Sequence, residues 1–506
     1  MVSPDFHLVL GIVLAGAAAP GQTPVSDAKP AMRHSEIVFM YASDPEAYRA
    51  YAATFVAWGG AETRQQVKMH HDMGIRCTGA MWCLTAGAKL LHDDAALRGA
   101  CSVDIEGKPI EVPWLFDHTY QGTKSYFGCT NNPVFREHNR KMVRQAMGGG
   151  ADGLHVDDHL GVASSACWAG GGLCDHCMAA FREYLKARAG APGSGMADQL
   201  KAAGVRDLGA FDYREIIRTY AATRQDYKKA QGRIPLMEVF LEFHLEAAAE
   251  NVRQLAQLAA EVAGHPVLLS ANAGLPSKWH THVLKHLTHV VCEVDQAARA
   301  GTGRIDGALA AYRLATQLGK PLAATASGQD WAFVKANNCE DLVRFWIALA
   351  YAHGQRFMVP HPARQWCFTD KLGTHWYAAP VAAYSGLYRF ISANAACFDD
   401  FEEADPKGVQ SPKATLCTVR RKAGARTVLH VLNTDYDAAA GKIRPAAKVT
   451  VTFPRTLAGA GASSQPAKAT LLSCDAPPQA VPALPEGENL KVELPELRLW
   501  TLVVLE

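Results

Sequence analysis

The sequence predicts a (β/α)8 TIM barrel followed by a C-terminal all-β sandwich. Over residues 31–398, short apolar runs alternate with amphipathic stretches of helical period. Over residues 399–506, strand-like runs are separated by Pro, Gly and Ala turns without helical stretches. A chain of 506 residues is long enough for a large barrel and an accessory domain, preceded by a signal peptide and linker at 1–30. The clearest sandwich strands are 427–437, 447–454, 468–474 and 498–506.

The barrel is predicted from eight apolar runs with helices between them. The runs are continuously apolar rather than alternating, as expected for parallel strands covered on both faces. The eight runs are 36–43, 75–83, 112–118, 152–158, 266–272, 288–295, 321–327 and 356–360. Helices are expected at 62–74, 132–150, 237–263, 307–318 and 339–354. A doubly wound open sheet is the alternative, but no glycine-rich phosphate loop follows the first strand.

Composition and the N-terminal stretch indicate an exported protein that acts on something other than nucleic acid. The net charge is +2 and the basic residues form no dense run, which argues against a nucleic-acid partner. Residues 8–19 have the length of a signal-peptide apolar core, and the small residues at its end, 15–19, suit a signal-peptidase site. The stretch before residue 8 lacks Lys and Arg, which are typical of a signal peptide. We therefore expect a secreted or periplasmic protein. No later run is long and uncharged enough to span a bilayer, and a homo-oligomer is left open.

Acidic residues end two of the predicted strands. In barrel enzymes the active site lies at the carboxyl ends of the strands. Asp157 and Asp158 end the fourth strand, and strand alternation favours Asp157 as the residue that faces the barrel mouth. Glu293 ends the apolar run "VVCEVD" and would bury a charge unless it faced a cleft, which makes it the best general acid/base. Asp295 replaces Glu293 if the register differs by two residues. The structural alternative is a helix cap for one of the two strand-four Asp residues and a salt bridge with an Arg or Lys for Glu293.

Amides, imidazoles and indoles accompany these acids at the other strand ends. Carboxylates can act as nucleophile and acid on a sugar, and Trp rings stack on its apolar face. Glycoside hydrolysis uses two carboxylates, roughly 5–5.5 Å apart for retention and roughly 6.5–9.5 Å apart for inversion. We therefore predict a glycoside hydrolase that cleaves an oligo- or polysaccharide without a catalytic cofactor. The candidate substrate-binding residues are Trp82, His118, His155, Asn272, Gln296, Asp330, Trp331, His361 and Trp366.

Two other functions stay open. His155, Asp157 and His159 alternate along one run and could converge on a metal ion, as in a metal-dependent hydrolase or deacetylase. The seventh predicted strand offers no carboxylate within its apolar run, which is compatible with a carbohydrate-binding barrel that has lost catalysis.

A group of cysteines indicates a structural metal site. Cys174 and Cys177 form "CDHC", whose two-residue gap matches one half of a tetrahedral zinc site. Cys129 and Cys167 lie on segments that border the same strand and could complete four sulfur ligands. Disulfides are the alternative, because an exported location favours them, and free thiols remain a third.

The stretch from Cys129 to Arg188 resembles family 42 glycoside hydrolases, the β-galactosidase type, and related barrel hydrolases. The likeness rests on a Cys before "NPVFR", a strand bearing acid, a cysteine cluster and the helix "FREYL". It implies a structural zinc held by the four cysteines above. That family has Asn-Glu at the fourth strand and a Glu nucleophile at the seventh, so its catalytic residues and specificity do not transfer.

The pairing of an Asp at strand four with an acid at strand six looks more like the barrel clans that act on α-glycosides, including α-galactosidases and α-fucosidases. That likeness implies Asp157 as the nucleophile and Glu293 or Asp295 as the acid/base.

Overall fold

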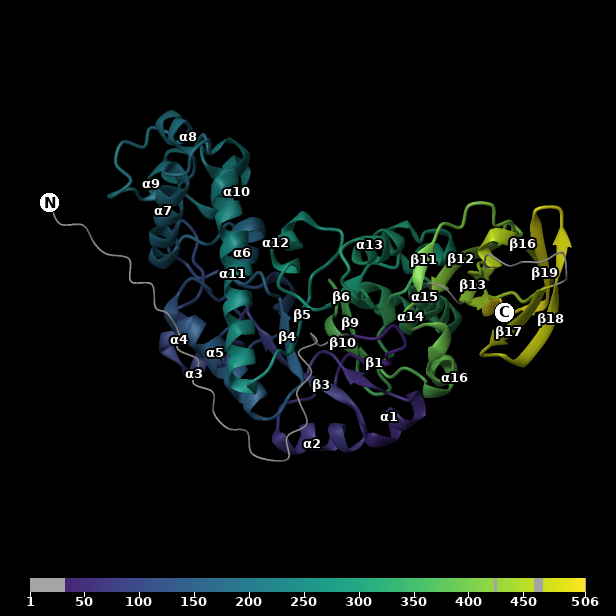
Figure 1. The fold of residues 1–506 in the computed structure, drawn as a ribbon. Coiled ribbons are helices and arrows are strands. Elements are labelled where there is room, and N and C mark those ends of the chain that lie inside the picture. The colour runs from purple at the N-terminus through teal and green to yellow at the C-terminus, as the bar shows by residue number, and fades with distance from the viewer. Residues whose placement is uncertain (1–31, 423–425, 459–466, 506) are drawn as a thin grey trace, which may run out of the picture.

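The computed structural model describes residues 32–422, 426–458 and 467–505. The predicted signal peptide and linker at 1–30 lie outside the described residues. Within them the chain forms an α/β barrel, a helical arm that stands out at one end and an antiparallel β domain at the other (Figure 1). This architecture confirms the predicted fold class. None of the helices in these ranges is long and apolar enough to cross a membrane.

The barrel consists of parallel strands in two ladders. Five pair in the order β1 (Val38–Phe39), β2 (Phe55–Val56), β3 (Arg76–Trp82), β4 (Gly153–Asp157) and β5 (Leu268–Ala271). Three more pair in the order β6 (Val290–Val294), β7 (Leu322–Ala326) and β8 (Arg356–Phe357). A parallel bridge between Phe39 and Val359 joins the last strand to the first. The carboxyl ends of β3 to β6 are therefore brought to one rim.

One predicted strand is wrong and one strand was missed. Residues 112–118 were expected to form the third strand, but Pro113–Leu115 is a short 3-10 helix, η1, inside the loop that follows β3. Proline lacks the N–H that a central strand needs, which explains the difference. The missing strand is β2, whose two residues are too few to give a periodic signal. The other seven predicted runs each contain an observed barrel strand.

Helices cover the outside of the barrel and end at recognisable caps. They include α1 (Pro45–Tyr51), α2 (Arg64–Asp72), α5 (Pro133–Gly148), α11 (Met237–Ala263), α13 (Asp306–Gln317), α14 (Gly328–Asn337), α15 (Glu340–Ala352) and α16 (Val381–Ala393). The Asn132 side chain caps α5 by accepting the N–H of Val134, with Pro133 in the first turn. Shorter helices α3 (Ala88–Asp93) and α4 (Ala95–Gly99) lie in the long loop after β3.

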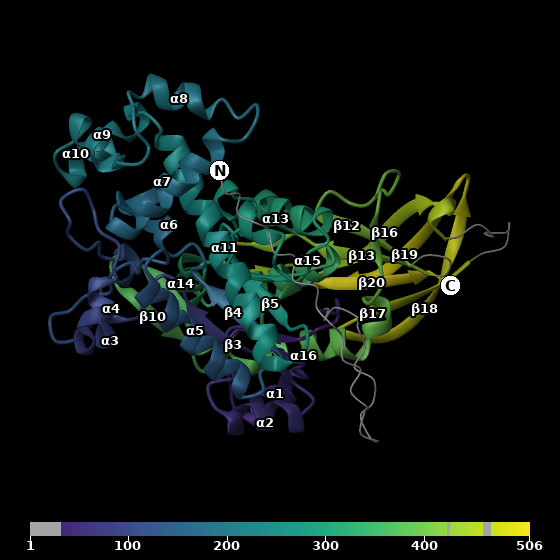
Figure 2. The same ribbon diagram turned by 60° about the vertical axis from the view of Figure 1, so that its left-hand side comes forward.

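The helical arm is an excursion between β4 and α11. It comprises α6 (Val162–Ser164), the π-helical turn η2 (Ser165–Ala169), α7 (Asp175–Ala189), α8 (Met196–Ala202), α9 (Tyr213–Tyr220) and α10 (Arg224–Ala230). It has its own buried cluster, in which Phe181, Tyr213 and Phe240 pack together. Figure 2 shows α8, α9 and α10 at the outer end of the arm, away from the barrel strands β3 and β4.

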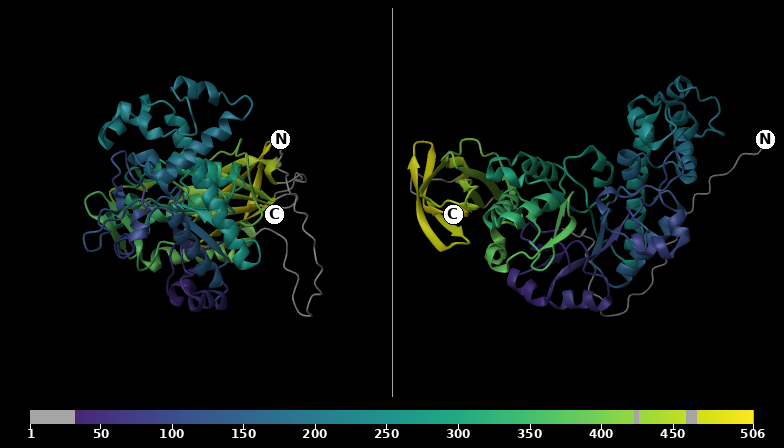
Figure 3. Two further views of the ribbon diagram at one scale, coloured as in Figure 1. Left: turned by 90° about the vertical axis from the view of Figure 1, so that its left-hand side faces the viewer. Right: turned by 180° about the vertical axis from the view of Figure 1, so that it is seen from behind.

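The β domain packs on the opposite side of the barrel from the arm (Figure 3). Its eight-stranded sheet runs in the order β11 (Glu402–Ala404), β12 (Thr415–Lys422), β13 (Arg426–Asn433), β20 (Trp500–Leu505), β17 (Ala467–Ser473), β18 (Ala476–Glu486), β19 (Asn489–Leu497) and β16 (Ala446–Pro454). Trp500 packs against Phe390 and Phe398 of the barrel domain. The domains therefore share one continuous hydrophobic core.

Candidate active site

A cavity of about 960 Å³ opens at the carboxyl ends of the barrel strands. Its walls come from the loops after β1 to β3, from the ends of β4 to β6, and from a hairpin of β9 (Gln365–Thr369) and β10 (Gly373–Tyr377). The cavity also extends along β3 to the side of α5. The Asp117 carboxylate accepts the Thr374 backbone N–H at 3.0 Å, which ties the hairpin to the loop after β3. Asp157, Asp158 and Glu293 all line this cavity.

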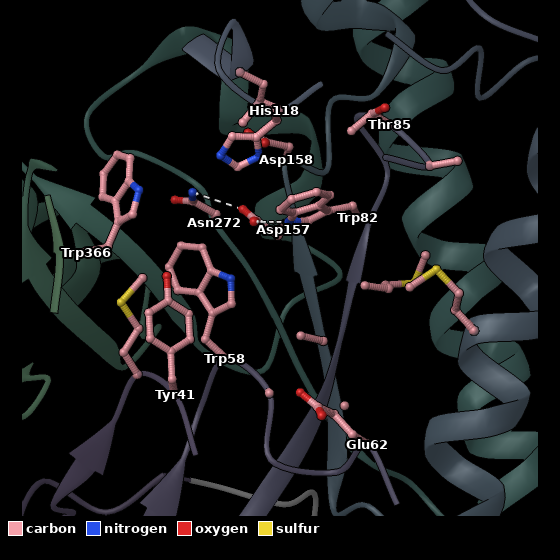
Figure 4. A pocket seen from close by; sticks show the side chains of 18 of the residues that line it. Tyr41, Trp58, Glu62, Trp82, Thr85, His118, Asp157, Asp158, Asn272 and Trp366 are labelled. Carbon is pink, nitrogen blue, oxygen red and sulfur yellow. Dashed lines mark hydrogen bonds between the residues drawn. The ribbon is translucent and has the colours of Figure 1, made fainter. Parts of the chain in front are cut away.

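Asp157, the last residue of β4, is held by two donors from neighbouring strands (Figure 4). Trp82 Nε1 at the end of β3 donates to its Oδ2 at 2.5 Å, and Asn272 Nδ2 after β5 donates to its Oδ1 at 3.2 Å. Burial raises the pKa of Asp157, while hydrogen bonds from Asn272, Trp82 and Trp58 act against that rise. These donors favour the ionised form and lessen the effect of burial, which makes Asp157 the better candidate for the carboxylate of the site.

Glu293, on β6, has fewer hydrogen-bond donors than Asp157 to offset the effect of burial on its pKa. Burial raises its pKa from 4.5 to about 8, and the negative charge of Asp157 adds to the rise, while Asn272 opposes it. Two carboxyl groups that face the same cavity are costly to ionise together, so the group with fewer donors keeps its proton. Of the two groups, Glu293 is therefore favoured as the carboxylic acid near neutral pH, and Asp157 as the group that ionises first.

Asp158 is the third acid of the cavity and has an unusual backbone. Its φ of 45° lies in the left-handed region, where Asp is tolerated better than most residues. Burial raises its pKa well above the ordinary value, and the charges of Asp157 and Glu293 raise it further. Backbone strain of this kind is concentrated at functional sites. These effects favour the protonated form of Asp158 beside Asp157.

Aromatic rings make up much of the cavity wall. Two of the predicted stacking residues, Trp82 and Trp366, line it, and so does the predicted His118. Sequence reasoning missed four further aromatic residues of the wall: Tyr41, Trp58, Trp114 and Trp376. Trp58 follows the two-residue strand β2, Trp114 lay in the mispredicted third strand, and Trp376 is on the hairpin, so the strand-end rule found none of them.

Two predicted binding residues near β7 lie in the interior instead. Trp331 is 0% exposed on α14 and donates from Nε1 to Thr325 Oγ1 at 3.0 Å, so it packs in the core and does not stack on a ligand. Asp330 accepts the backbone N–H groups of Gln296 and Ala298 at 2.8 Å each. It fixes the loop after β6 and does not line the cavity.

Other predicted residues also serve the scaffold. Gln296 is buried beside Asp330, outside the cavity lining. Asp295 is exposed on the outer side of the β6 end and accepts the Ala297 N–H, which leaves Glu293 as the acid of that strand in the cavity. His361 is buried: its Nδ1 accepts the N–H groups of Ala363 and Arg364. It shapes the loop that brings Arg364 to the wall of the cavity.

The metal site predicted from His155, Asp157 and His159 does not form. His155 is fully buried below the cavity, where its Nδ1 pairs with Ser270 Oγ at 2.9 Å and its ring lies against Trp58. His159 Nδ1 pairs with the Asn272 carbonyl at 3.1 Å. Among the residues that the structure describes, these side chains are not a group of ligand atoms within 4.8 Å.

Three of the four predicted cysteines do come together. The sulfurs of Cys129, Cys174 and Cys177 lie within 4.8 Å of one another, with Cys129 Sγ 3.4 Å from each of the other two, and this group could bind a metal. Cys167 is not part of it, because that residue lies in the π-helical turn and packs against another apolar cluster, which contains Leu160, Ala163, Leu245 and Ala248. All 13 cysteines fall in the described ranges and are free.

No protein-family model matches the chain. It is 22% identical to an α-agarase of Alteromonas agarilytica over 304 residues, which are 59% of this chain and 20% of that protein. It is 23% identical to an α-agarase of Thalassotalea agarivorans over 305 residues, which are 58% of this chain and 20% of that protein. The matched region therefore spans about a fifth of the length of these curated relatives.

Solved structures share the fold at low sequence identity. An α-L-fucosidase isoenzyme of Paenibacillus thiaminolyticus superposes with a TM-score of 0.54 and 10% identity, covering 94% of this chain and 100% of that one. A cycloisomaltooligosaccharide glucanotransferase of Paenibacillus sp. gives 0.57 and 9%, covering 93% and 84%. An α-amylase of Geobacillus thermoleovorans gives 0.53 and 7%, covering 94% and 98%. These likenesses support the arrangement of a barrel followed by a β domain.

Proposed function

We propose that the chain is a glycoside hydrolase that cleaves a polysaccharide. The observation that carries this proposal is the contrast between two carboxyl groups in one aromatic cavity. Asp157 accepts hydrogen bonds from Trp82 and Asn272 and is ionised, whereas burial raises the pKa of Glu293 to about 8. A carboxylate beside a carboxylic acid is the pair that glycoside hydrolysis requires.

In the proposed mechanism Glu293 gives its proton to the glycosidic oxygen as the bond to the anomeric carbon breaks. Asp157 attacks that carbon, as the α-glycosidase likeness implies, and a water molecule later displaces it while Glu293 takes up the water proton. In an inverting variant Asp157 would instead activate the water directly. Asp158, protonated beside Asp157, would donate a hydrogen bond to a sugar hydroxyl.

The substrate that we propose is agarose. The two curated relatives are α-agarases, and their match covers more than half of this chain. The lining of the cavity supports a polymer, because Trp366 and Trp376 of the hairpin line it together with Trp82 and Trp114 of β3 and the loop after it. Several indoles along one cleft offer stacking surfaces to consecutive sugar rings.

The test is hydrolysis of agarose and of a panel of other polysaccharides by the full chain and its variants. We expect Asp157→Asn and Glu293→Gln to reduce kcat by at least about a thousandfold, as removal of a nucleophile or acid does. Asp295→Asn is the matched control, because Asp295 ends the same strand but lies outside the cavity. Full activity in both cavity variants would refute the assignment, and binding of polysaccharide without cleavage by the wild type would identify a carbohydrate-binding barrel.

We also propose that Cys129, Cys174 and Cys177 hold a structural zinc ion. Sulfurs in a tetrahedral zinc site lie about 3.8 Å apart, close to the 3.4 Å between Cys129 and its two partners. Hydrogen bonds from Cys129 and Cys177 lower the pKa of Cys174, whereas the contact with Cys174 raises that of Cys129 and burial raises that of Cys177, so Cys174 is the thiol of the three that ionises most readily. Neither ring nitrogen of the buried His244 has a hydrogen-bond partner with good geometry, and the imidazole lies against Gly172, two residues before Cys174.

His244 is our candidate for the fourth ligand in place of Cys167. Its ring nitrogens do not lie within 4.8 Å of all three sulfurs, so the imidazole would have to move toward them when zinc binds. Bound there, zinc would supply no catalysis; it would tie the segment before α5 to the start of α7 and so hold the helical arm against the barrel.

A further inference from the structure

An exposed indole continues the aromatic wall beyond the cavity. Trp168 belongs to the π-helical turn η2, which follows the catalytic strand β4, and 42% of its surface is exposed. Its ring centre lies 6.2 Å from that of Trp114, with the rings at 64°. Trp114 lines the cavity that contains Asp157. The two indoles thus extend the aromatic surface from the cavity wall to the π-helical turn at the base of the helical arm.

The local structure presents Trp168 rather than burying it. Ser165, Ala166 and Ala169 of the same turn are buried, so the turn is anchored and Trp168 is the side chain that projects from it. Gly170, with φ of 76°, ends the turn in a conformation that favours glycine. Turns of π-helix occur often at functional sites. An anchored turn with one exposed indole is a rigid platform.

Trp114 adds to this rigidity. It packs edge-to-face on Phe127 at 5.8 Å and meets Trp168 in a similar geometry. The contact with Phe127 therefore fixes the position of the Trp114 ring. A platform that is ordered before binding loses little conformational entropy when a ligand stacks on it. Stacking on an indole suits the C–H face of a sugar ring.

We propose that Trp168 and Trp114 form an outer subsite that binds a sugar unit of the same polysaccharide chain whose scissile bond lies at Asp157 and Glu293. The proposal rests on the proposed function and adds that the enzyme holds its substrate at several units, on the side of the helical arm. Such a subsite contributes to binding of long chains only, because a short oligosaccharide that fills the cavity does not reach Trp168.

The experiment compares Trp168→Ala with the wild type on agarose and on agaro-oligosaccharides of increasing length. We expect KM for agarose to rise about tenfold, in line with truncation of an aromatic binding residue, and kinetics on the shortest cleaved oligosaccharide to stay the same. Tyr220→Ala is the matched control, since Tyr220 is 45% exposed on α9 of the same arm, whereas it is Trp168 whose ring meets Trp114 of the cavity wall. Equal loss on every length, or no loss on agarose, would overturn the subsite.

A binding measurement separates failure of this proposal from failure of the proposed function. In affinity electrophoresis through gels that contain dissolved agarose or another polysaccharide of the panel, Glu293→Gln is expected to be retarded and the Glu293→Gln/Trp168→Ala double variant to be retarded less. If the wild type cleaves nothing but the retardation depends on Trp168, the subsite stands without the catalytic assignment. If no polysaccharide retards the chain, or if retardation is the same in both variants, the subsite is excluded.

Discussion

The indole of Trp82 donates a hydrogen bond of 2.5 Å to the carboxylate of Asp157, which joins the ends of β3 and β4 at the mouth of the barrel. The sequence alone suggested Trp82 as a ring that stacks on sugar. The structure gives it a second role, because its N–H stabilises the ionised form of Asp157 against the effect of burial. A positioning residue of this kind can be tested without removal of the ring.

Trp82→Phe is expected to lower kcat by about tenfold to a hundredfold while KM changes little. The variant keeps an aromatic surface but removes the donor to ionised Asp157, so the pKa of Asp157 rises. Activity that needs the carboxylate is then lost at a higher pH, and the acidic limb of the pH–rate profile moves upward. The measurement is kcat/KM against pH. Trp366→Phe, at an indole of the wall with no hydrogen bond to Asp157, should leave that limb in place.

The basic limb of the wild-type profile is expected near pH 8. Burial and the charge of Asp157 raise the pKa of Glu293 to about 8, and the proton donor is lost as the pH rises through that value. Glu293→Gln should remove this limb. A substrate whose leaving group needs no protonation, such as an activated aryl glycoside, should restore the first step in the variant. A limb that persists in Glu293→Gln would assign the proton donor elsewhere, with Asp158 as the next candidate.

Glu293→Gln is also expected to stabilise the fold at alkaline pH. In the folded chain the pKa of Glu293 is raised from 4.5 to about 8, so the folded state holds the proton more tightly than the unfolded state. Its contribution to stability is therefore complete below pH 4.5 and is lost as the pH rises toward 8. The difference in Tm between variant and wild type should grow over that interval, as measured by thermal unfolding. A constant difference would mean that Glu293 is more hydrated than the structure indicates.

The sequence predicted the scaffold better than the cavity wall. The long helix α11 has the predicted bounds, and seven strands fall within predicted runs, because buried apolar segments and helix caps are local signals. The rule that active-site residues lie at strand ends located Asp157 and Glu293. It did not predict whether the side chains that follow a strand end face the cavity or the interior. Asp330 is an example. Its side chain and backbone N–H both hydrogen-bond to the Ser327 hydroxyl at the start of α14, so "SGQD" is a helix-capping sequence, whereas we predicted Asp330 to bind substrate.

The aromatic wall was missed for a different reason. Trp58 and Trp114 reach the cavity from a two-residue strand and from an irregular loop, where no periodic signal exists. Cys167 was grouped with the other cysteines because it is close in sequence, yet a π-helical turn points it away from them. Which loop residues reach the cavity or the cysteine group therefore depends on how the loops pack in three dimensions, and local sequence patterns do not predict that packing.

The cysteine group gives the last prediction, which concerns metal content. We expect the purified chain to contain about one zinc ion, and Cys129→Ser and Cys177→Ser to lose it and to lower Tm, because two of the ligand segments are then no longer joined. His244→Phe should weaken zinc binding as well, whereas Cys167→Ser is the matched control and should keep the metal, since Cys167 packs against the apolar cluster around Leu160. Elemental analysis and thermal unfolding with and without a chelator measure both effects. Zinc that is retained in Cys129→Ser but lost in Cys167→Ser would contradict the geometry, and a disulfide found among these cysteines in the purified protein would replace the metal site altogether.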